Sequence, residues 1–270
     1  MRAYRVAYDG RASRGFQRQP DVPTVEDTLF AALSELGLGD ADGPPGYTAA
    51  GRTDAGVSAL AQTVAFEAPD WLSPRAFTAH LPDDVHVWAS ASVPGDFHAT
   101  HDARAREYTY FLQVPPADPE LIADLEARLA GEHDLHNLTP DETGTVRELS
   151  IASSRDGPFR VVRVRADGFP RQLVRRLVAL YGRVVRGERP LSFVDRVLGP
   201  APLSGPEGFP PAPPTPLVLT DVSYPRTFEV DPDAVRMATG SVAERRRRDR
   251  ARARVGRAIQ AGMDSAGDNP

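Results

Sequence analysis

The most informative stretch of this 270-residue chain is Ala50-Gly51-Arg52-Thr53-Asp54-Ala55-Gly56-Val57-Ser58-Ala59, around which the other segments are organised. Strand-prone residues surround it, yet it sets an arginine and a carboxylate two positions apart between two glycines. Alternation along an extended chain would point Arg52 and Asp54 to the same side. An arginine beside a carboxylate keeps the carboxylate ionised, as a nucleophile or an electrostatic catalyst requires. The same spacing suits a turn held by an Asp–Arg bridge, so the stretch alone leaves a catalytic and a structural interpretation open.

Composition limits the chemistry that this stretch could carry. The chain has no cysteine, which excludes disulfides, thiolate nucleophiles and cysteine-bound zinc. No apolar run is long enough to span a bilayer, so we expect a soluble protein of the cytoplasm. The length suffices for the core of one large or two modest domains.

Charge is distributed unevenly along the chain. All 32 basic residues are arginine, and 37 acidic residues bring the formal net charge to -5. Eight arginines lie between Glu244 and Arg257 with only two acidic residues, a local balance of +6. The remainder carries 24 basic against 35 acidic residues, or -11. Because arginine forks suit phosphate contact and base stacking, the negative total does not exclude RNA as a partner.

Alternation, helical periodicity and turn residues predict an α+β order of elements. In the first hundred residues we expect a strand over 2–8, a helix capped by Thr24 and ending near Leu36, strands over 47–53 and 62–66, a short helix over 73–80 and a strand ending at Val93. Beyond them we expect a strand over 104–111, a helix over 118–129, a hairpin of 146–154 and 159–166, a helix that opens at Phe169, an irregular connector over 199–216, a strand over 217–225 and a helix over 231–261.

The helix that opens at Phe169 has the clearest amphipathic pattern. Its apolar side chains form one broad arc, made of Leu173, Val174, Leu177, Val178, Leu180, Tyr181 and Val184. The opposite arc holds the arginines Arg171, Arg175, Arg176, Arg183 and Arg186. Periodicity alone makes these arginines a solvated face as readily as a binding face.

The heptad Gly51–Val57 resembles the signature of the TruA family of tRNA pseudouridine synthases, and companion segments follow in the family's order. They are Tyr8-Asp9-Gly10, Gly15-Phe16-Gln17-Arg18-Gln19, Leu81-Pro82-Asp83-Asp84, Asp96-Phe97-His98-Ala99, Tyr108-Thr109-Tyr110, Gly131-Glu132-His133-Asp134-Leu135, Leu173-Val174-Arg175 and the strand that begins at Leu217. The resemblance covers about residues 1–225. The chain departs from the family at Phe16, where tryptophan is more usual, at Ser58, where histidine usually stands, and at Leu135, which replaces an aromatic residue.

The resemblance implies an isomerase with a divided α/β fold. Two α/β subdomains, residues 1–100 and 101–230, would join antiparallel sheets across a central active-site cleft, and residues 231–270 would form an arginine-rich extension. The implied reaction converts uridine to pseudouridine in the anticodon stem-loop of tRNA, at positions 38 to 40. A homodimer would bind the tRNA, without a cofactor and without a metal ion.

The resemblance also assigns roles to five residues of this chain. Asp54 would be the essential carboxylate, and Arg175 would pair with it. Tyr108 would pack on the target base and take part in the chemistry. Arg52 would hold the extruded nucleotide, and Leu217 would help to wall the uracil pocket.

Further RNA contact is expected from Arg104 and Arg106 together with Arg52. The arginine-rich segment after residue 231 could bind RNA or form a solvated helix with ion pairs between successive turns. His133 and His136 lack a third ligand at a useful spacing, so we expect no metal there.

Two other classes of function fit part of the pattern. A non-catalytic RNA-binding protein could use the same sheets and arginines, but phosphate binding gains nothing from Asp54 between Arg52 and Gly56. A nucleoside hydrolase with paired carboxylates would need a second acid near Asp54, and none is evident in the sequence.

Overall fold

The computed structural model describes residues 1–40, 42–203 and 207–267. Its strands are β1 (Arg2–Tyr8), β2 (Thr48–Ala49), β3 (Ser58–Phe66), β4 (Val85–Ser92), β5 (Ala105–Gln113), β6 (Gly131–Asp134), β7 (Val146–Asp156), β8 (Phe159–Ala166), β9 (Leu217–Ser223) and β10 (Glu229–Val230). Its α-helices are α1 (Val25–Glu35), α2 (Pro74–Thr78), α3 (Pro119–Leu129), α4 (Leu173–Val185), α5 (Ser192–Leu198) and α6 (Pro232–Gly267).

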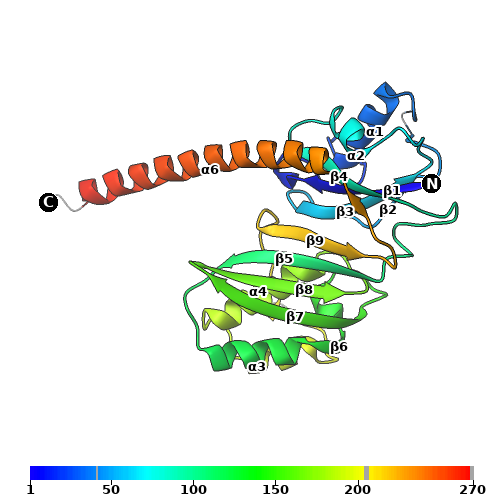
Figure 1. Cartoon of the computed structure of the whole chain (residues 1–270). Helices are drawn as coiled ribbons and strands as arrows, with labels where there is room; N and C mark the ends of the chain where they lie inside the picture. Colours follow the sequence, from blue (N-terminus) through cyan, green and yellow to red (C-terminus); the bar gives the residue numbers. More distant parts are fainter. Residues whose placement is uncertain (41, 204–206, 268–270) are drawn as a thin grey trace.

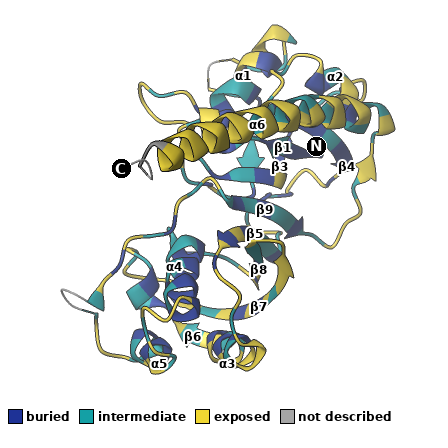
Figure 2. Cartoon of the chain, turned by 90° about the vertical axis from the view of Figure 1, so that its left-hand side faces the viewer, coloured by how far each residue is buried: buried dark blue, intermediate teal, exposed yellow. Residues whose placement is uncertain are grey.

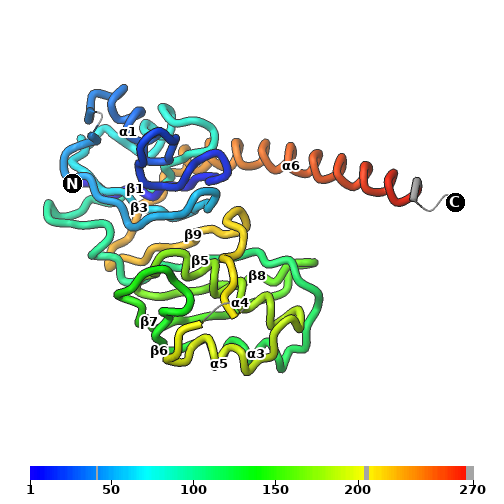
Figure 3. The backbone as a smooth tube through the Cα atoms, turned by 180° about the vertical axis from the view of Figure 1, so that it is seen from behind, coloured from blue at the N-terminus to red at the C-terminus, as the bar shows by residue number. Residues whose placement is uncertain are grey.

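One continuous sheet runs through both halves of the molecule (Figure 1), in the order β10-β4-β1-β3-β9-β5-β8-β7-β6, with β2 paired to β3. The pairs within each half are antiparallel, and the halves meet where β3 pairs with β9 in parallel. Helices α3, α4 and α5 lie together against the C-terminal half (Figure 3). The predicted α+β fold with two joined antiparallel sheets is therefore confirmed, and a short parallel strand pair makes the join.

The two halves have separate hydrophobic cores that interlock at this join. The N-terminal core takes in Leu219 from β9, although that strand follows the C-terminal half in sequence. The C-terminal core takes in Leu217 from the same strand and Val57 from the N-terminal half. Tyr108 packs against both cores. The seam between the cores is thus built by segments that lie far apart in the sequence.

Helix α4 buries the arc that its periodicity predicts. All seven apolar residues of that arc are at most 5% exposed. The helix begins at Leu173 rather than at Phe169, because Gln172 adopts a left-handed conformation with φ 59° and interrupts helical geometry. The three residues from Phe169 to Arg171 are therefore free to line a cavity beside the helix.

The structure also differs from the expected elements elsewhere in the chain, and β3 begins four residues before its expected start. The strand expected over 47–53 is confined to Thr48–Ala49, because the following residues turn out of the sheet toward the seam. Helix α5 and the strands β6 and β10 were not expected, because each is too short to show a distinctive periodic pattern. Part of the connector expected over 199–216, residues 204–206, lies outside the described residues. Helix α6 runs to Gly267, six residues beyond its expected end.

Helix α6 begins on the N-terminal half and projects well beyond it (Figure 1). Its first turn is capped by Asp231, whose Oδ1 accepts from the backbone N–H groups of Asp233 and Ala234 at 3.0 and 3.1 Å. Farther along, its side chains are exposed (Figure 2). In the described part of the chain, no helix combines the length and the apolar character that crossing a membrane would require.

Candidate active site

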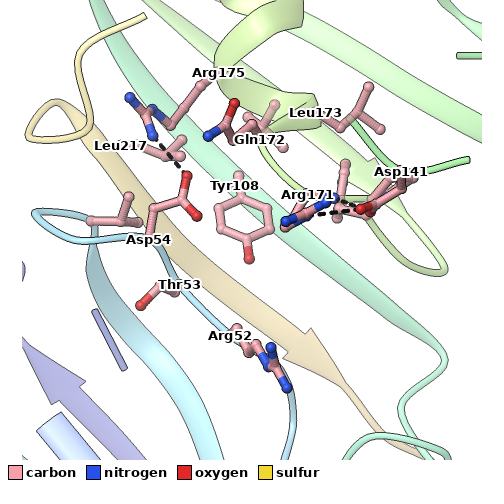
Figure 4. A pocket seen from close by; sticks show the side chains of 14 residues that line it. Arg52, Thr53, Asp54, Tyr108, Asp141, Arg171, Gln172, Leu173, Arg175 and Leu217 are labelled. Atoms are coloured by element: carbon pink, nitrogen blue, oxygen red, sulfur yellow. Dashed lines mark hydrogen bonds and ion pairs between the residues drawn. The ribbon is translucent and has the colours of Figure 1, made fainter. Parts of the chain in front are cut away.

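A pocket of about 270 Å³ opens at the seam between the two halves (Figure 4). Five segments line it: the loop that contains Arg52 and Asp54, the strand β5, the loop that contains Asp141, the residues that precede and begin α4, and the start of β9. The structure brings Arg52, Asp54, Tyr108, Arg175 and Leu217 together in this one pocket. Its volume lies just below the roughly 300–1,000 Å³ of pockets that hold drug-sized ligands, so it suits a ligand as small as a single extruded nucleobase rather than a duplex.

Asp54 is held in the pocket by an ion pair that crosses the seam. Arg175 Nη1 donates to Asp54 Oδ2 at 2.7 Å, although the residues are 121 positions apart. Arg175 Nε donates to the carbonyl of Ala212 at 2.7 Å, which fixes the guanidinium from its other side. The Asp54 side chain is still 35% exposed, and its second oxygen turns toward Tyr108 (Figure 4). The carboxylate is therefore oriented and yet open to the pocket.

Tyr108 forms the opposite wall from Asp54. Its ring meets the ring of Phe169 edge to face, with centroids 5.1 Å apart. Burial raises the pKa of Tyr108 to about 12, and the charge of Asp54 acts in the same direction. Its hydroxyl has no hydrogen-bond partner among the described residues. At neutral pH this side chain is therefore a neutral phenol that can donate a hydrogen bond to a ligand.

The loop that carries Asp54 is fixed to β1 and β3 by buried hydrogen bonds. The Tyr8 hydroxyl lies 2.7 Å from Thr53 Oγ1, and burial raises the pKa of Tyr8, which keeps it protonated. Gln62 Nε2 donates to the carbonyl of Gly51 at 2.8 Å. The backbone N–H of Phe16 donates to the carbonyl of Thr53 at 3.1 Å. Phe16, which stands where tryptophan is more usual in the family, is a core residue that stacks on Tyr8.

Two glycines from the N-terminal motifs allow this close packing against the loop. A Cβ on Gly10 would lie 2.0 Å from the carbonyl oxygen of Val57, a distance that real contacts exclude. Gly15 has φ 107°, and a Cβ there would lie 2.9 Å from the carbonyl oxygen of Thr53. The segments that accompany the central stretch in the sequence thus support its conformation directly.

We expect Gly10→Ala to destabilise the protein by about 1–3 kcal/mol or more, because backbone must move to admit the methyl group. Thermal unfolding measures this loss as a lower Tm. Gly95→Ala is the matched control, since Gly95 lies in an exposed turn with no atom within 4 Å of its would-be Cβ. Equal Tm values for the two variants would contradict the close contact between Gly10 and the backbone of Val57.

Arg52 is an exposed cation at the rim of the pocket. Within the described part of the chain it has neither a hydrogen-bond partner nor an ion-pair partner. It also lines a neighbouring hollow of about 610 Å³ together with His98 and Thr100. The side chain is therefore placed to reach a ligand that extends from the pocket across this rim.

The other two arginines that we expected to bind RNA, Arg104 and Arg106, lie in different environments. Arg104 is exposed just before β5, where its backbone N–H donates to the carbonyl of Ser223 at the end of β9, and it does not line the pocket. Arg106 instead donates to three backbone carbonyls: Ala50 and Thr100, each at 2.8 Å, and Asp167. The guanidinium of Arg106 thus ties the entrance of the Asp54 loop to neighbouring segments. These bonds use four of its five N–H groups and support a positioning role, and contact between Arg106 and RNA stays a prediction.

Sequence reasoning missed several residues that line the pocket. Phe169 belongs to a motif with Arg175, and its aromatic ring at that spacing was a usable signal. Asp141 also lines the pocket, and its carboxylate accepts two hydrogen bonds from Arg171. The backbone N–H of Arg171 donates at 2.7 Å and its Nε donates at 2.8 Å. The loop that holds Asp141 shows no pattern in the sequence. In the described residues, no group of three or more His, Asp or Glu side chains could hold a metal ion.

The family model and the similar curated proteins agree on one family. The family model described as tRNA pseudouridine synthase matches residues 126–225. The chain is 58% identical over 275 residues to tRNA pseudouridine synthase A of Haloarcula marismortui, covering 97% of this chain and 100% of that protein. It is 59% identical over 263 residues to tRNA pseudouridine synthase A of Natronomonas pharaonis, and the match covers 96% of this chain and 98% of that protein. A solved structure of a Cbf5-Nop10-Gar1 complex matches with a TM-score of 0.33 and 13% identity, over 67% of this chain and 54% of that one.

Proposed function

The chain belongs to the tRNA pseudouridine synthase A family, and we propose that it isomerises uridine to pseudouridine in the anticodon stem-loop of tRNA with Asp54 as its essential carboxylate. The observation that supports this most directly is the Asp54–Arg175 pair, 2.7 Å long, at the wall of a pocket the size of one base. The direct test is to incubate unmodified tRNA with the purified protein and map pseudouridine at each position. Modification confined to the anticodon stem-loop is the expected result, and none at all would refute the proposal.

The reaction requires the base to be detached and rejoined within one site. The bond between N1 and C1′ breaks, the uracil turns, and C5 bonds to C1′. C5 then loses its proton and N1 gains one, so the product is an isomer of the substrate. A carboxylate can start this sequence as a nucleophile or by electrostatic stabilisation of the positive charge that develops on the sugar. Asp54, oriented by Arg175 and open to the pocket, fits either role.

The uridine must leave the base stack before Asp54 can reach it. Arg52 is the residue we assign to this step, because its cation is unpaired among the described residues and stands between the pocket and the adjacent hollow. Its guanidinium can bind a phosphate or stack on a base. Leu217, buried at the start of β9, would close the apolar side of the uracil site. Arg104, exposed just before β5, stays a proposed RNA contact.

Tyr108 would stack on the uracil and donate its phenolic hydrogen to it. Because its pKa is about 12, the hydroxyl does not ionise near neutral pH and cannot act there as a phenolate base. We therefore assign Tyr108 to holding the base rather than to removing the C5 proton.

Substitutions of Tyr108 separate its ring from its hydroxyl. Tyr108→Phe should fold normally and lower turnover by about three- to tenfold, the effect of one neutral hydrogen bond. Tyr108→Ala should also lose the stacking of the ring on the base, which would weaken binding of that nucleotide by about 1–3 kcal/mol. Single-turnover rates of pseudouridine formation measure both effects.

The pH dependence provides the control for this assignment. With a pKa of about 12, Tyr108 keeps one protonation state across the neutral range, so the ratio of wild-type to Tyr108→Phe rates should not change with pH there. A ratio that rises with pH through that range would mean that the phenol titrates and acts as a base.

We further propose that two copies act together on one tRNA in the cytoplasm, with residues 1–100 and 101–230 as subdomains and 231–270 as an extension. Family membership supports the dimer and the location. The two hydrophobic cores support the division into subdomains, although β9 contributes to both cores. Light scattering of the purified protein, with and without tRNA, tests the dimer.

A further inference from the structure

The part of α6 from Arg245 onward carries a high density of positive charge. It carries eight arginines from Arg245 to Arg257. Every side chain from 250 to 265 is exposed (Figure 2). None of the roles assigned above uses this segment.

The arginines of α6 divide into a paired set and an unpaired set. The paired set is Arg245 with Asp9, Arg247 and Arg248 with Glu244, and Arg252 with Asp249. The unpaired set is Arg246, Arg250, Arg254 and Arg257, and among the described residues these four have no ion-pair partner. Their spacings of four, four and three residues place them in one row along the helix. That row is turned about a third of a turn away from Arg245 and Asp249, which contact the body of the protein.

The base of this helix is fixed to the turn that supports the active-site loop. Arg245 Nη1 lies 3.0 Å from Asp9 Oδ2, and Arg11 Nη2 lies 3.0 Å from Asp249 Oδ2. Asp9 directly precedes Gly10, which packs on Val57 of the loop that contains Asp54. The row of arginines therefore has a defined placement relative to the pocket.

We propose that the unpaired row (Arg246, Arg250, Arg254 and Arg257) binds the phosphate backbone of the tRNA at a distance from the modified uridine. The inference rests on the proposed function, because that function makes tRNA the partner. The row is about 16 Å long at 1.5 Å per residue, and each guanidinium can grip a phosphate with two parallel hydrogen bonds. Helix α6 has no aromatic residue to stack on bases. The contact is therefore to phosphates and independent of base sequence.

A protein partner fits this row less well than RNA does. Stable protein interfaces centre on large apolar or aromatic side chains. Beyond Asp249, the exposed large apolar residues of α6 are Val255, Ile259 and Met263, which form a separate row on another side of the helix; nearer its start, Val242 is exposed one turn before Arg246 as a single apolar residue. The arginine row contains no large apolar residue, and its charge complements a polyanion.

A pair of double variants on the same turns of α6 tests this proposal. Arg250→Gln with Arg254→Gln removes two members of the unpaired row. Arg248→Gln with Arg252→Gln is the matched control: the spacing and the charge removed are the same, but these arginines are paired. Glu244 keeps Arg247 and Asp249 keeps Arg11 in the control. Circular dichroism verifies that both variants keep their helix, and filter binding measures the tRNA affinity at several salt concentrations.

The plot of log K against log salt has a negative slope. We expect Arg250→Gln with Arg254→Gln to flatten this slope by about 1.4–1.8, the value for two lost phosphate contacts. The control should change the slope by less than half that amount. An unchanged slope in the first variant would make α6 a solvated helix, and equal changes in the two variants would reduce the effect to overall charge. Loss of a dimer by light scattering in the first variant alone would point to an acidic surface of a second copy. Each of these three outcomes overturns the proposal.

Pseudouridine formation at saturating tRNA keeps this test separate from the proposed function. Both variants should retain the wild-type rate there, since neither touches the pocket. If the wild type makes no pseudouridine but the slopes differ as expected, the proposed function fails and the arginine row stands. If the wild type is active and the slopes do not differ, only the arginine row fails.

Discussion

Asp54→Asn should abolish pseudouridine formation while leaving tRNA binding nearly intact. The amide has almost the volume of the carboxylate, and its oxygen can still accept from Arg175 Nη1 as Oδ2 does now at 2.7 Å. A carboxamide is a far poorer nucleophile and carries no charge to stabilise a developing cation. Turnover should therefore fall by at least about a thousandfold, within the range that follows loss of a catalytic nucleophile.

Two assays on one preparation measure this result: filter binding of tRNA and release of tritium from uridine labelled at C5. Asp141→Asn is the control, because Asp141 lines the same pocket but pairs with the exposed Arg171. That variant should keep most of its activity. Substantial tritium release by Asp54→Asn would remove Asp54 from the centre of the mechanism. Tight tRNA binding without release by the wild type would favour a non-catalytic RNA-binding protein.

Arg175→Ala should lower turnover by about 10- to 100-fold and leave tRNA affinity almost unchanged. Its charged hydrogen bond to Asp54 is worth about 1.5–3 kcal/mol by analogy with other such bonds, and each 1.4 kcal/mol is tenfold in rate. Without Arg175 the carboxylate is free to rotate away from its present orientation, so the loss should be in kcat rather than in KM. Single-turnover rates at saturating tRNA measure the expected loss.

The adjacent Arg176 provides a closely matched control. Arg176 Nη1 donates to the carbonyl of Phe209 at 3.2 Å, just as Arg175 Nε donates to Ala212 in the same connector. Each alanine variant therefore loses one charge and one contact to the connector, but only Arg175→Ala loses the contact to Asp54. Equal losses of kcat in the two variants would show that the connector, and not the ion pair with Asp54, determines activity.

Arg176 also shows where periodicity misleads. The arc of arginines on α4 predicts an exposed Arg176, yet its guanidinium is partly buried under the connector. The helical wheel places a residue on a side of the helix, but it cannot tell what covers that side. Here the covering segment is the Pro/Gly-rich connector, which has no regular pattern to reveal its path.

Elements that depend on local physics were predictable. Thr24 caps α1 in a reciprocal box with Asp27, and the seven apolar residues of α4 are buried. The hairpin of β7 and β8 turns at Gly157, where φ is 55°. In each case the deciding interactions lie within a few residues of one another, so the sequence displays them together.

The α+β class, most of the regular elements and, through the ordered motifs, the residues proposed for the site could all be predicted from the amino-acid sequence. How those residues meet depends on the three-dimensional fold. Insertion of β9 between β3 and β5 sets the seam, and the seam brings Arg175 to Asp54 across 121 positions. The fold also places Arg106 where it donates to backbone carbonyls. Along α6 it pairs some arginines with nearby carboxylates, such as Arg248 with Glu244, and leaves others without an ion-pair partner among the described residues. The physical reason is that side-chain type and spacing report local geometry, whereas hydrogen-bond partners of a long flexible side chain depend on which distant backbone the fold places beside it.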